Sequence, residues 1–212
     1  MTGLTFVQKS LMAATGAAVV SFTGGQAAQA ITFDFTGPRD TFPSISDTVD
    51  GISLTGIGFG PGRTNNVTQN RQGIGVDGGR NNQIDGGRRN ENDNFDVLQL
   101  TFDQRVTLTS AIFGQVNLGN DTNDGFQLLV DGTELTTENP LAASGQVPFD
   151  FTSFDLAART GKVFEFTVPN SNDGYRLASL TVEPVPEPLT ILGSLSALGM
   201  GAVLKKKQQN KS

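Results

Sequence analysis

The sequence predicts an all-β domain built from antiparallel strands, in the form of a β-sandwich, of which the jelly roll is one variety. Three observations support this. Apolar and polar residues alternate with a period of two at residues 31–35, 49–59, 98–102, 106–113, 126–130, 163–168 and 175–182. Turn-forming residues separate these segments, and no interior window has the apolar stripe of a helix. A single sheet is disfavoured, because its apolar face would need a cover that no helix supplies.

The first 30 residues have the order of a secretory signal peptide. Lys9 precedes an apolar run at residues 11–22, and Ala28-Gln29-Ala30 provides an A-x-A cleavage site directly before the first strand. The alternative is a buried N-terminal helix, but the run is too short to span a membrane and its small-residue exit fits cleavage. We therefore expect residues 1–30 to be a signal peptide and the folded domain to begin at Ile31.

The strands of the predicted domain, residues 31–184, are joined by residues with known turn preferences. Asp131-Gly132 lies between two apolar runs, which is a strong signal for a two-residue hairpin. Pro148, Pro169 and Asp173-Gly174 interrupt the later strands. The pattern indicates many short strands but does not predict their order in a sheet.

Residues 60–94 differ from the rest of the domain. They are rich in Gly, Asn, Arg and Asp, their few apolar residues are isolated, and a near-repeat places Asp77, Asp85 and Asp93 eight residues apart. Calcium takes six to eight oxygen ligands, which Asp, Asn and carbonyl groups of a glycine-rich loop can supply. We therefore single out four candidate calcium ligands, with Asn82 and Asn94 as further oxygen donors: Asp77, Asp85, Asp93 and Asp96.

The alternative to a calcium site is an ordinary long loop whose Asp-Gly-Gly elements are turns and whose carboxylates are neutralised by Arg80, Arg88 and Arg89. The spacing does not match the calcium-binding helix-loop-helix pattern, and it resembles glycine-rich calcium repeats only loosely. Both interpretations remain open at the level of sequence.

Composition restricts the function of the domain. The chain has no His, Cys or Trp, which removes the commonest general base, thiolate chemistry and the best ring for stacking on a sugar. Glu187 and five lysines lie in the end segments, which leaves 20 acidic and 10 basic residues between Ile31 and Pro184. A domain this acidic repels phosphate backbones, so nucleic-acid binding is disfavoured.

Two further functions are compatible with the composition. Secreted sandwiches often bind extracellular glycans, but Tyr175 is the only Tyr and most Phe residues occupy core-facing positions, so no aromatic platform is visible. A glycosidase needs only a pair of carboxylates, which four glutamates could provide: Glu91, Glu134, Glu138 and Glu165. Nothing marks one pair above another, and we expect no enzymatic activity. Adhesion to protein or ice would need a regular Thr-rich face, whereas the Thr residues are scattered.

The C-terminal segment, residues 185–212, combines three features. Val185-Pro186-Glu187-Pro188 precedes an uncharged stretch at residues 189–204, and Lys205-Lys206-Lys207 follows it. As a helix the 16-residue stretch would reach about 24 Å, short of the roughly 30 Å hydrocarbon core. Lysines at one end only predict that this end is cytoplasmic and that the domain is outside.

This tripartite tail resembles the PEP-CTERM sorting signal of bacterial cell-envelope proteins. The resemblance implies that an exosortase recognises Pro186, Glu187 and Pro188 and cuts near them, while the hydrophobic helix holds the chain in the inner membrane before processing. The two prolines keep the backbone extended, which suits a peptide read by another protein. A plain C-terminal anchor is the alternative. The prediction is an exported cell-surface or extracellular-matrix protein with a non-catalytic binding or structural role, whose ligands could be glycan or calcium.

Overall fold

The computed structural model of the chain describes residues 29–60, 63–77, 82–86, 95–116, 124–141, 145–170 and 173–186. These residues form fourteen strands and contain no α-helix: β1 Ile31–Asp34, β2 Asp40–Phe42, β3 Ile45–Val49, β4 Ile52–Gly60, β5 Arg63–Asn65, β6 Val67–Asn70, β7 Gly73–Val76, β8 Ile84–Asp85, β9 Val97–Val116, β10 Asp124–Val130, β11 Thr133–Leu141, β12 Gly145–Asp150, β13 Thr160–Thr167 and β14 Gly174–Pro184. Every pairing among these strands is antiparallel, so the predicted all-β antiparallel class is confirmed.

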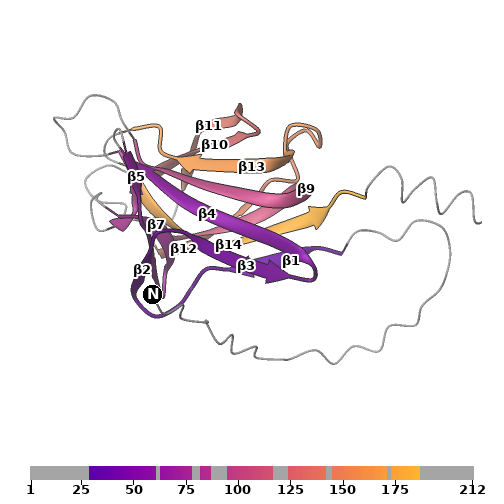
Figure 1. Ribbon diagram of the computed structural model, residues 1–212. Helices are drawn as coiled ribbons and strands as arrows, with labels where there is room; N and C mark the ends of the chain where they lie inside the picture. Colours follow the sequence, from indigo (N-terminus) through magenta and orange to yellow (C-terminus); the bar gives the residue numbers. More distant parts are fainter. Residues whose placement is uncertain are drawn as a thin grey trace, which may run out of the picture.

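The sheet is organised around β9, the longest strand (Figure 1). Its first half pairs with β4 on one side and β13 on the other, and its second half pairs with β14 and β12. The main path runs β11-β10-β13-β9-β14-β7-β6-β2, and β1 and β8 join it through β14. One strand therefore belongs to two sets of neighbours, and the sheet curves as it passes from one set to the other.

The two segments predicted at residues 98–102 and 106–113 are parts of this one strand. Asp103 and Arg105, which lie between them, are exposed and belong to β9 at the point where its pairing with β13 shifts register. Arg105 donates to the carbonyl of Thr160 on β13 at 2.7 Å and forms an ion pair with Asp131 at 3.3 Å. The interruption of the apolar pattern therefore does not end the strand. Side-chain contacts on the solvent side hold these residues in place.

The hairpin between β10 and β11 forms as the sequence predicts. Asp131 and Gly132 both have positive φ angles, 49° and 77°, as a two-residue hairpin turn with matching twist requires. The Asp131 carboxylate also accepts hydrogen bonds from the backbone N–H groups of Lys162 and Val163, both at 2.9 Å. The turn therefore fixes the start of β13 as well as its own hairpin.

Residues 60–94 depart most from the expectation of a loop. Their described parts contain β5 to β8, and their four isolated apolar residues are completely buried: Val67, Ile74, Val76 and Ile84. Gly73 and Gly75 alternate with these residues because the backbone is approached too closely for a side chain. A Cβ on Gly75 would clash with the backbone carbonyl of Asn82, and one on Gly73 with that of Leu177. Because these glycines have no side chain, the pattern of hydrophobicity alone did not reveal the two-residue period of the strands.

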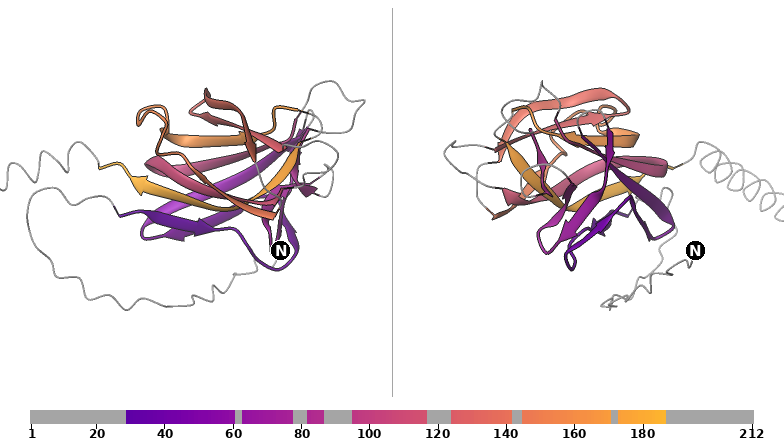
Figure 2. Two further views of the ribbon diagram at one scale, coloured as in Figure 1. Left: turned by 180° about the vertical axis from the view of Figure 1, so that it is seen from behind. Right: turned by 60° about the vertical axis from the view of Figure 1, so that its left-hand side comes forward.

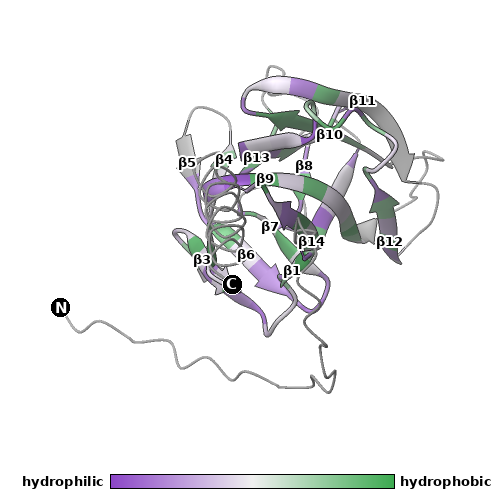
Figure 3. Ribbon diagram, turned by 90° about the vertical axis from the view of Figure 1, so that its right-hand side faces the viewer, coloured by the Kyte–Doolittle hydropathy of each residue, from purple (hydrophilic) through white to green (hydrophobic). Residues whose placement is uncertain are grey.

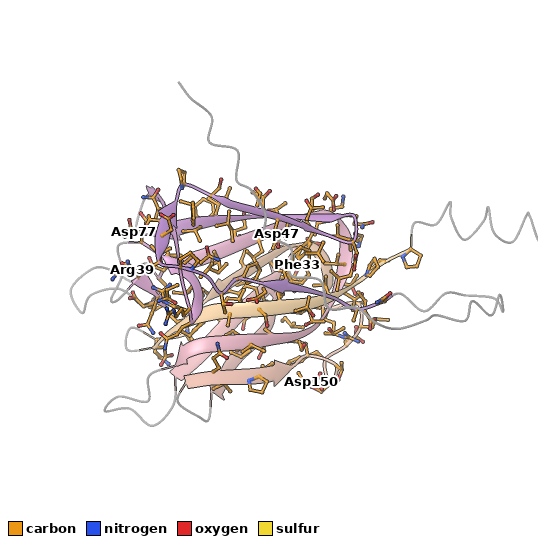
Figure 4. All side chains as sticks on the ribbon, turned by 90° about the horizontal axis from the view of Figure 1, so that it is seen from below. Phe33, Arg39, Asp47, Asp77 and Asp150 are labelled. Atoms are coloured by element: carbon orange, nitrogen blue, oxygen red, sulfur yellow. The ribbon has the colours of Figure 1, made fainter. Side chains whose placement is uncertain are left out.

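The core is rich in phenylalanine rings. Phe113 on β9 stacks on Phe126 of β10 with ring centroids 4.5 Å apart, and its edge contacts include Tyr175 at 5.1 Å. Phe33 on β1 meets Phe102 on β9 at 5.6 Å, although β1 pairs only with β14 in the sheet. Figure 3 shows the strands around a common interior, and Figure 4 shows Phe33 lying among them. Core-facing placement of most Phe residues is therefore confirmed.

The ends of the sheet lie together. Ile31, at the start of β1, is opposite Val182, near the end of β14. Figures 1 and 2 show these two strands leaving the sheet at the same end of the molecule. Pro186, beyond β14, is exposed, whereas Glu187, Pro188, the stretch at 189–204 and residues 1–28 lie outside the described residues. No helix in the described part of the chain has the length and hydrophobicity of a membrane span.

Candidate functional site

Two of the four predicted calcium ligands, Asp85 and Asp96, are brought together by the fold. Asp85 is in β8, whose pairing with β14 places it opposite Gly174. Asp96 immediately precedes β9, and its backbone N–H donates to the backbone carbonyl of Asp85 at 2.9 Å. The start of β9 and the start of β14 therefore hold the two acids side by side at one end of the sheet.

Both carboxyl groups are buried and touch each other. The Asp85 and Asp96 side chains are 4% and 3% exposed, and a hydrogen bond joins them. Two carboxylates in contact repel each other by about 4 kcal/mol even at an effective dielectric constant of about 20. Carboxylates are acceptors only, so a hydrogen bond between the pair requires a proton on one of them.

Burial is the largest cause that raises the pKa of Asp96, and the charge of Asp85 is the second. Together they move it from 3.8 to about 8, although the backbone hydrogen bond with Asp85 acts in the opposite direction. At neutral pH and without a bound cation, Asp96 therefore carries the proton. This is the behaviour of like charges that share a site with little water.

The residues around the pair form a buried polar network. Thr167 donates its hydroxyl to the Asp96 carbonyl at 2.8 Å, and Tyr175 donates to the Thr167 carbonyl at 2.8 Å. Gln83 donates to the carbonyl of Gly174 at 3.3 Å. Burial raises the pKa of Tyr175, followed by the charge of Asp173, so the phenol stays neutral and acts as a donor. These bonds fix the backbone on both sides of the carboxyl pair.

One side of the Asp96 carboxyl faces Gly60, the last residue of β4. A Cβ on Gly60 would lie 3.0 Å from Asp96 Oδ1 and would overlap the side-chain amide of Asn65. The side-chain amide of Asn65 and the carboxyl group of Asp96 therefore both lie next to the Cα of Gly60, on the side where other residues carry a Cβ. The other oxygen, Asp96 Oδ2, is buried and has no hydrogen-bond partner among the described residues.

The other predicted ligands do not join this pair in the described structure. Asp77 follows β7, where its backbone N–H donates to the Asn66 carbonyl at 2.8 Å and its carboxylate accepts from the Asn66 amide at 3.5 Å. In Figure 4 Asp77 lies at the same end of the molecule as Arg39. Asp93 and Asn94 lie outside the described residues. Within the described ranges, no group of three or more acidic side chains is arranged to hold a metal ion.

The candidate glycosidase residues are arranged differently. Glu134 on β11 and Glu165 on β13 both lie opposite Leu129 of β10, so they share one face of the sheet two strand spacings apart, roughly 10 Å. Glu165 accepts a hydrogen bond from Gln99 at 2.8 Å. Glu138 belongs to β11, and Glu91 lies outside the described residues. The pair thus lies on the solvent side of a sheet, and one of its members already has a side-chain partner.

Tyr175, the only Tyr of the chain, is completely buried. Its ring packs against Phe113, and its hydroxyl is used by the network around the carboxyl pair. It belongs to the core and does not offer a face for stacking on a sugar.

Sequence reasoning missed Asp173, Gln83 and Thr167 as neighbours of the pair. All three are less than 7% exposed, which is unusual for such polar residues. Asp173-Gly174 was recognised as a turn, but only the pairing of β14 with β8 reveals that it meets Asp85. Comparison of the chain with family models, curated proteins and solved structures finds no match.

Proposed function

We propose that this chain is an exported cell-surface or extracellular-matrix protein, cut after a signal peptide at one end and at a Pro-Glu-Pro sorting motif at the other. The observation that supports this most directly is the position of the domain ends. The described sheet begins at Ile31 and ends at Pro184, next to the two predicted processing points. Ile31 pairs opposite Val182, so both processing segments would leave the domain at one end.

In this proposal the sorting motif is presented on a short, fixed tether. The backbone N–H of Val185 donates to the carbonyl of Arg105 at 3.1 Å, so the chain is held to the sheet up to the residue before Pro186. Pro186 itself is exposed. A membrane-bound exosortase would reach Pro186 without unfolding the domain, because Pro186 lies beyond the last backbone hydrogen bond, that of Val185, which holds the described chain to the sheet.

We propose further that the curved sheet is a β-sandwich in which β9 crosses from one layer to the other. One layer would contain β3, β4, the first half of β9, β13, β10 and β11. The other would contain β12, the second half of β9, β14 and β1. The contacts of Phe33 with Phe102 and of Phe113 with Phe126 join strands from opposite layers, which is how a sandwich fills its core.

The role of the domain in this proposal is structural or binding, without catalysis. Its outer surface includes a row of short polar side chains across four strands, in which Thr32, Thr181, Ser110 and Asp150 lie opposite one another. Thr32 and Thr181 are joined through their hydroxyls at 3.0 Å. Such a surface suits packing in a hydrated extracellular layer.

Replacing Pro186, Glu187 and Pro188 together by alanine tests the sorting step. The variant is expected to fold and to be exported, but to accumulate uncut in the membrane fraction, because the exosortase no longer finds its extended recognition peptide. Fractionation with immunoblotting against the domain measures this. Leu156→Ala, at a side chain that is 61% exposed on the domain, is the matched control and should be sorted normally. Normal release of the triple-alanine variant would contradict the sorting role.

A further inference from the structure

Two hairpin turns of this domain are built from an Asp-Gly dipeptide with almost the same backbone. Asp50 and Gly51 have φ angles of 50° and 81°, and Asp131 and Gly132 have 49° and 77°. In such a dipeptide the backbone nitrogen of the Gly can attack the carboxyl carbon of the Asp, because no side chain on the Gly covers it. A Val precedes the Asp in both turns, so this neighbour does not set the two apart.

The two turns differ in what holds the Asp carboxylate. One oxygen of Asp131 accepts hydrogen bonds from the backbone N–H groups of Lys162 and Val163, both at 2.9 Å. The other oxygen pairs with Arg105 at 3.3 Å, and the backbone N–H of Asp131 donates to the carbonyl of Val163 at 2.8 Å. The Asp131 carboxyl group therefore cannot turn toward its own backbone without losing these contacts.

The carboxylate of Asp50 is not held in this way. Asp50 and Gly51 are exposed, and no residue in the described part of the chain hydrogen-bonds to the Asp50 side chain. Val49 and Ile52 are paired opposite each other, so the two turn residues lie outside the ladder of β3 with β4. Among the described strands β3 pairs only with β4, whereas β10 pairs with β13 as well as β11. The β3–β4 turn is therefore the easier of the two to open locally.

We propose that Asp50-Gly51 is a modification site at which the backbone rearranges to isoaspartate, and that its contacts protect Asp131-Gly132 from the same reaction. The Gly51 nitrogen bonds to the carboxyl carbon of Asp50, and the nitrogen's proton leaves with the carboxyl OH as water, which closes a cyclic imide. Water then opens the ring. Cleavage at the side-chain carbonyl restores Asp, and cleavage at the main-chain carbonyl leaves isoaspartate, with no net change in mass.

The product has a structural consequence, because the backbone of an isoaspartate runs through Cβ and is one carbon longer. Val49 and Ile52 would then no longer close the turn in register, and β3 would separate first, since it has a partner on one side only. Ile45 and Val49 of β3 pack against the core. The modification would therefore loosen one edge of the domain and uncover apolar surface there.

Ageing of the whole folded chain at about pH 5, where part of an ordinary Asp carboxyl is protonated and can lose its OH, tests the proposal. After several weeks at body temperature, peptide mapping by mass spectrometry is expected to find the Asp50 peptide split into two forms of equal mass. One of them should resist an Asp-specific protease. The second form should be several-fold less abundant at Asp131. In a chain aged in guanidinium chloride, both sites should react to a similar extent.

Asp50→Gly is the matched variant, because Gly-Gly suits a two-residue turn of this type and has no carboxyl group to react. It is expected to fold and to give no second form of this peptide. Equal amounts of the rearranged form at Asp50 and Asp131 in the folded chain, or none at Asp50, overturns the proposal. The proposal does not depend on export, which is tested separately by fractionation.

Discussion

The natural protein is expected to become less stable as the pH rises from about 4 to about 8, and Asp96→Asn is expected to abolish this dependence on pH. The pKa of Asp96 is about 8 in the folded protein against 3.8 as the ordinary value. Between these values the folded state holds a proton that the unfolded state has released, so stability falls with rising pH. The stabilisation is complete below the ordinary pKa and is lost as the pH passes the folded one.

The size of this effect follows from the shift. One pKa unit corresponds to about 1.4 kcal/mol, so the free energy of unfolding of the natural protein should fall by about 2–5 kcal/mol relative to the variant across this range. Urea denaturation at several pH values, in chelator, measures the difference. An asparagine amide can replace the protonated carboxyl as a donor to Asp85 at every pH. The free energy of unfolding of the variant should therefore not change with pH across this range.

Asp150→Asn provides the control for the pH experiment. The side-chain and backbone hydrogen bonds from Thr152 lower the pKa of the exposed Asp150 carboxyl, the backbone one at 2.7 Å. A lowered pKa contributes stability that is present at neutral pH and is lost as the pH falls, so in this variant the slope of stability against pH should differ from that of the natural protein only on the acid side. Equal slopes for the natural protein and Asp96→Asn between pH 4 and pH 8 would refute the shared proton.

Phe113→Ala is expected to cost about 3–5 kcal/mol of unfolding free energy, because it removes a buried ring and leaves a cavity. Phe113 is completely buried and contacts four other rings: Phe126 at 4.5 Å, Tyr175 at 5.1 Å, Phe166 at 6.3 Å and Phe149 at 6.4 Å. It therefore ties the second half of β9 to β10, β12, β13 and β14 at once. Few other positions join so many strands.

Urea denaturation at constant pH measures the loss, with Phe113→Leu as a conservative variant that should cost less than about 1.5 kcal/mol. Leu156→Ala, at an exposed position, should stay within about 0.5 kcal/mol of the natural protein. A loss below about 1 kcal/mol for Phe113→Ala would show that the proposed layers do not depend on this ring.

Sequence patterns over a few neighbouring residues predicted the strands and turns whose formation depends on neighbouring residues. The alternation around Phe33 predicted β1, and Asp131-Gly132 predicted the hairpin of β10 with β11, because both depend on residues near in sequence. The order of the strands could not be predicted in this way. Pairings such as β1 with β14 depend on packing between residues far apart in the chain.

The candidate site was predicted in part for the same reason. The sequence singled out Asp85 and Asp96 as candidate calcium ligands, and the fold places these two acids together, but even spacing suggested that Asp77 would join them. Asp96 meets Asp85 because β8 pairs with β14 and the chain then returns to begin β9. Asp77 instead contacts Asn66 at the open end of the β6–β7 hairpin. Equal spacing along the chain places residues close together in space only in a regular structural repeat. This segment instead folds into separate short strands.

The most direct test of the proposed export and sorting is the intact mass of the protein recovered from the outside of the cell. Our account predicts a chain that begins at Ile31 and ends near Pro188, which contains the whole described sheet and lacks the C-terminal lysines. A recovered chain that still contained residues 1–30, or that retained Lys205 to Ser212, would contradict it.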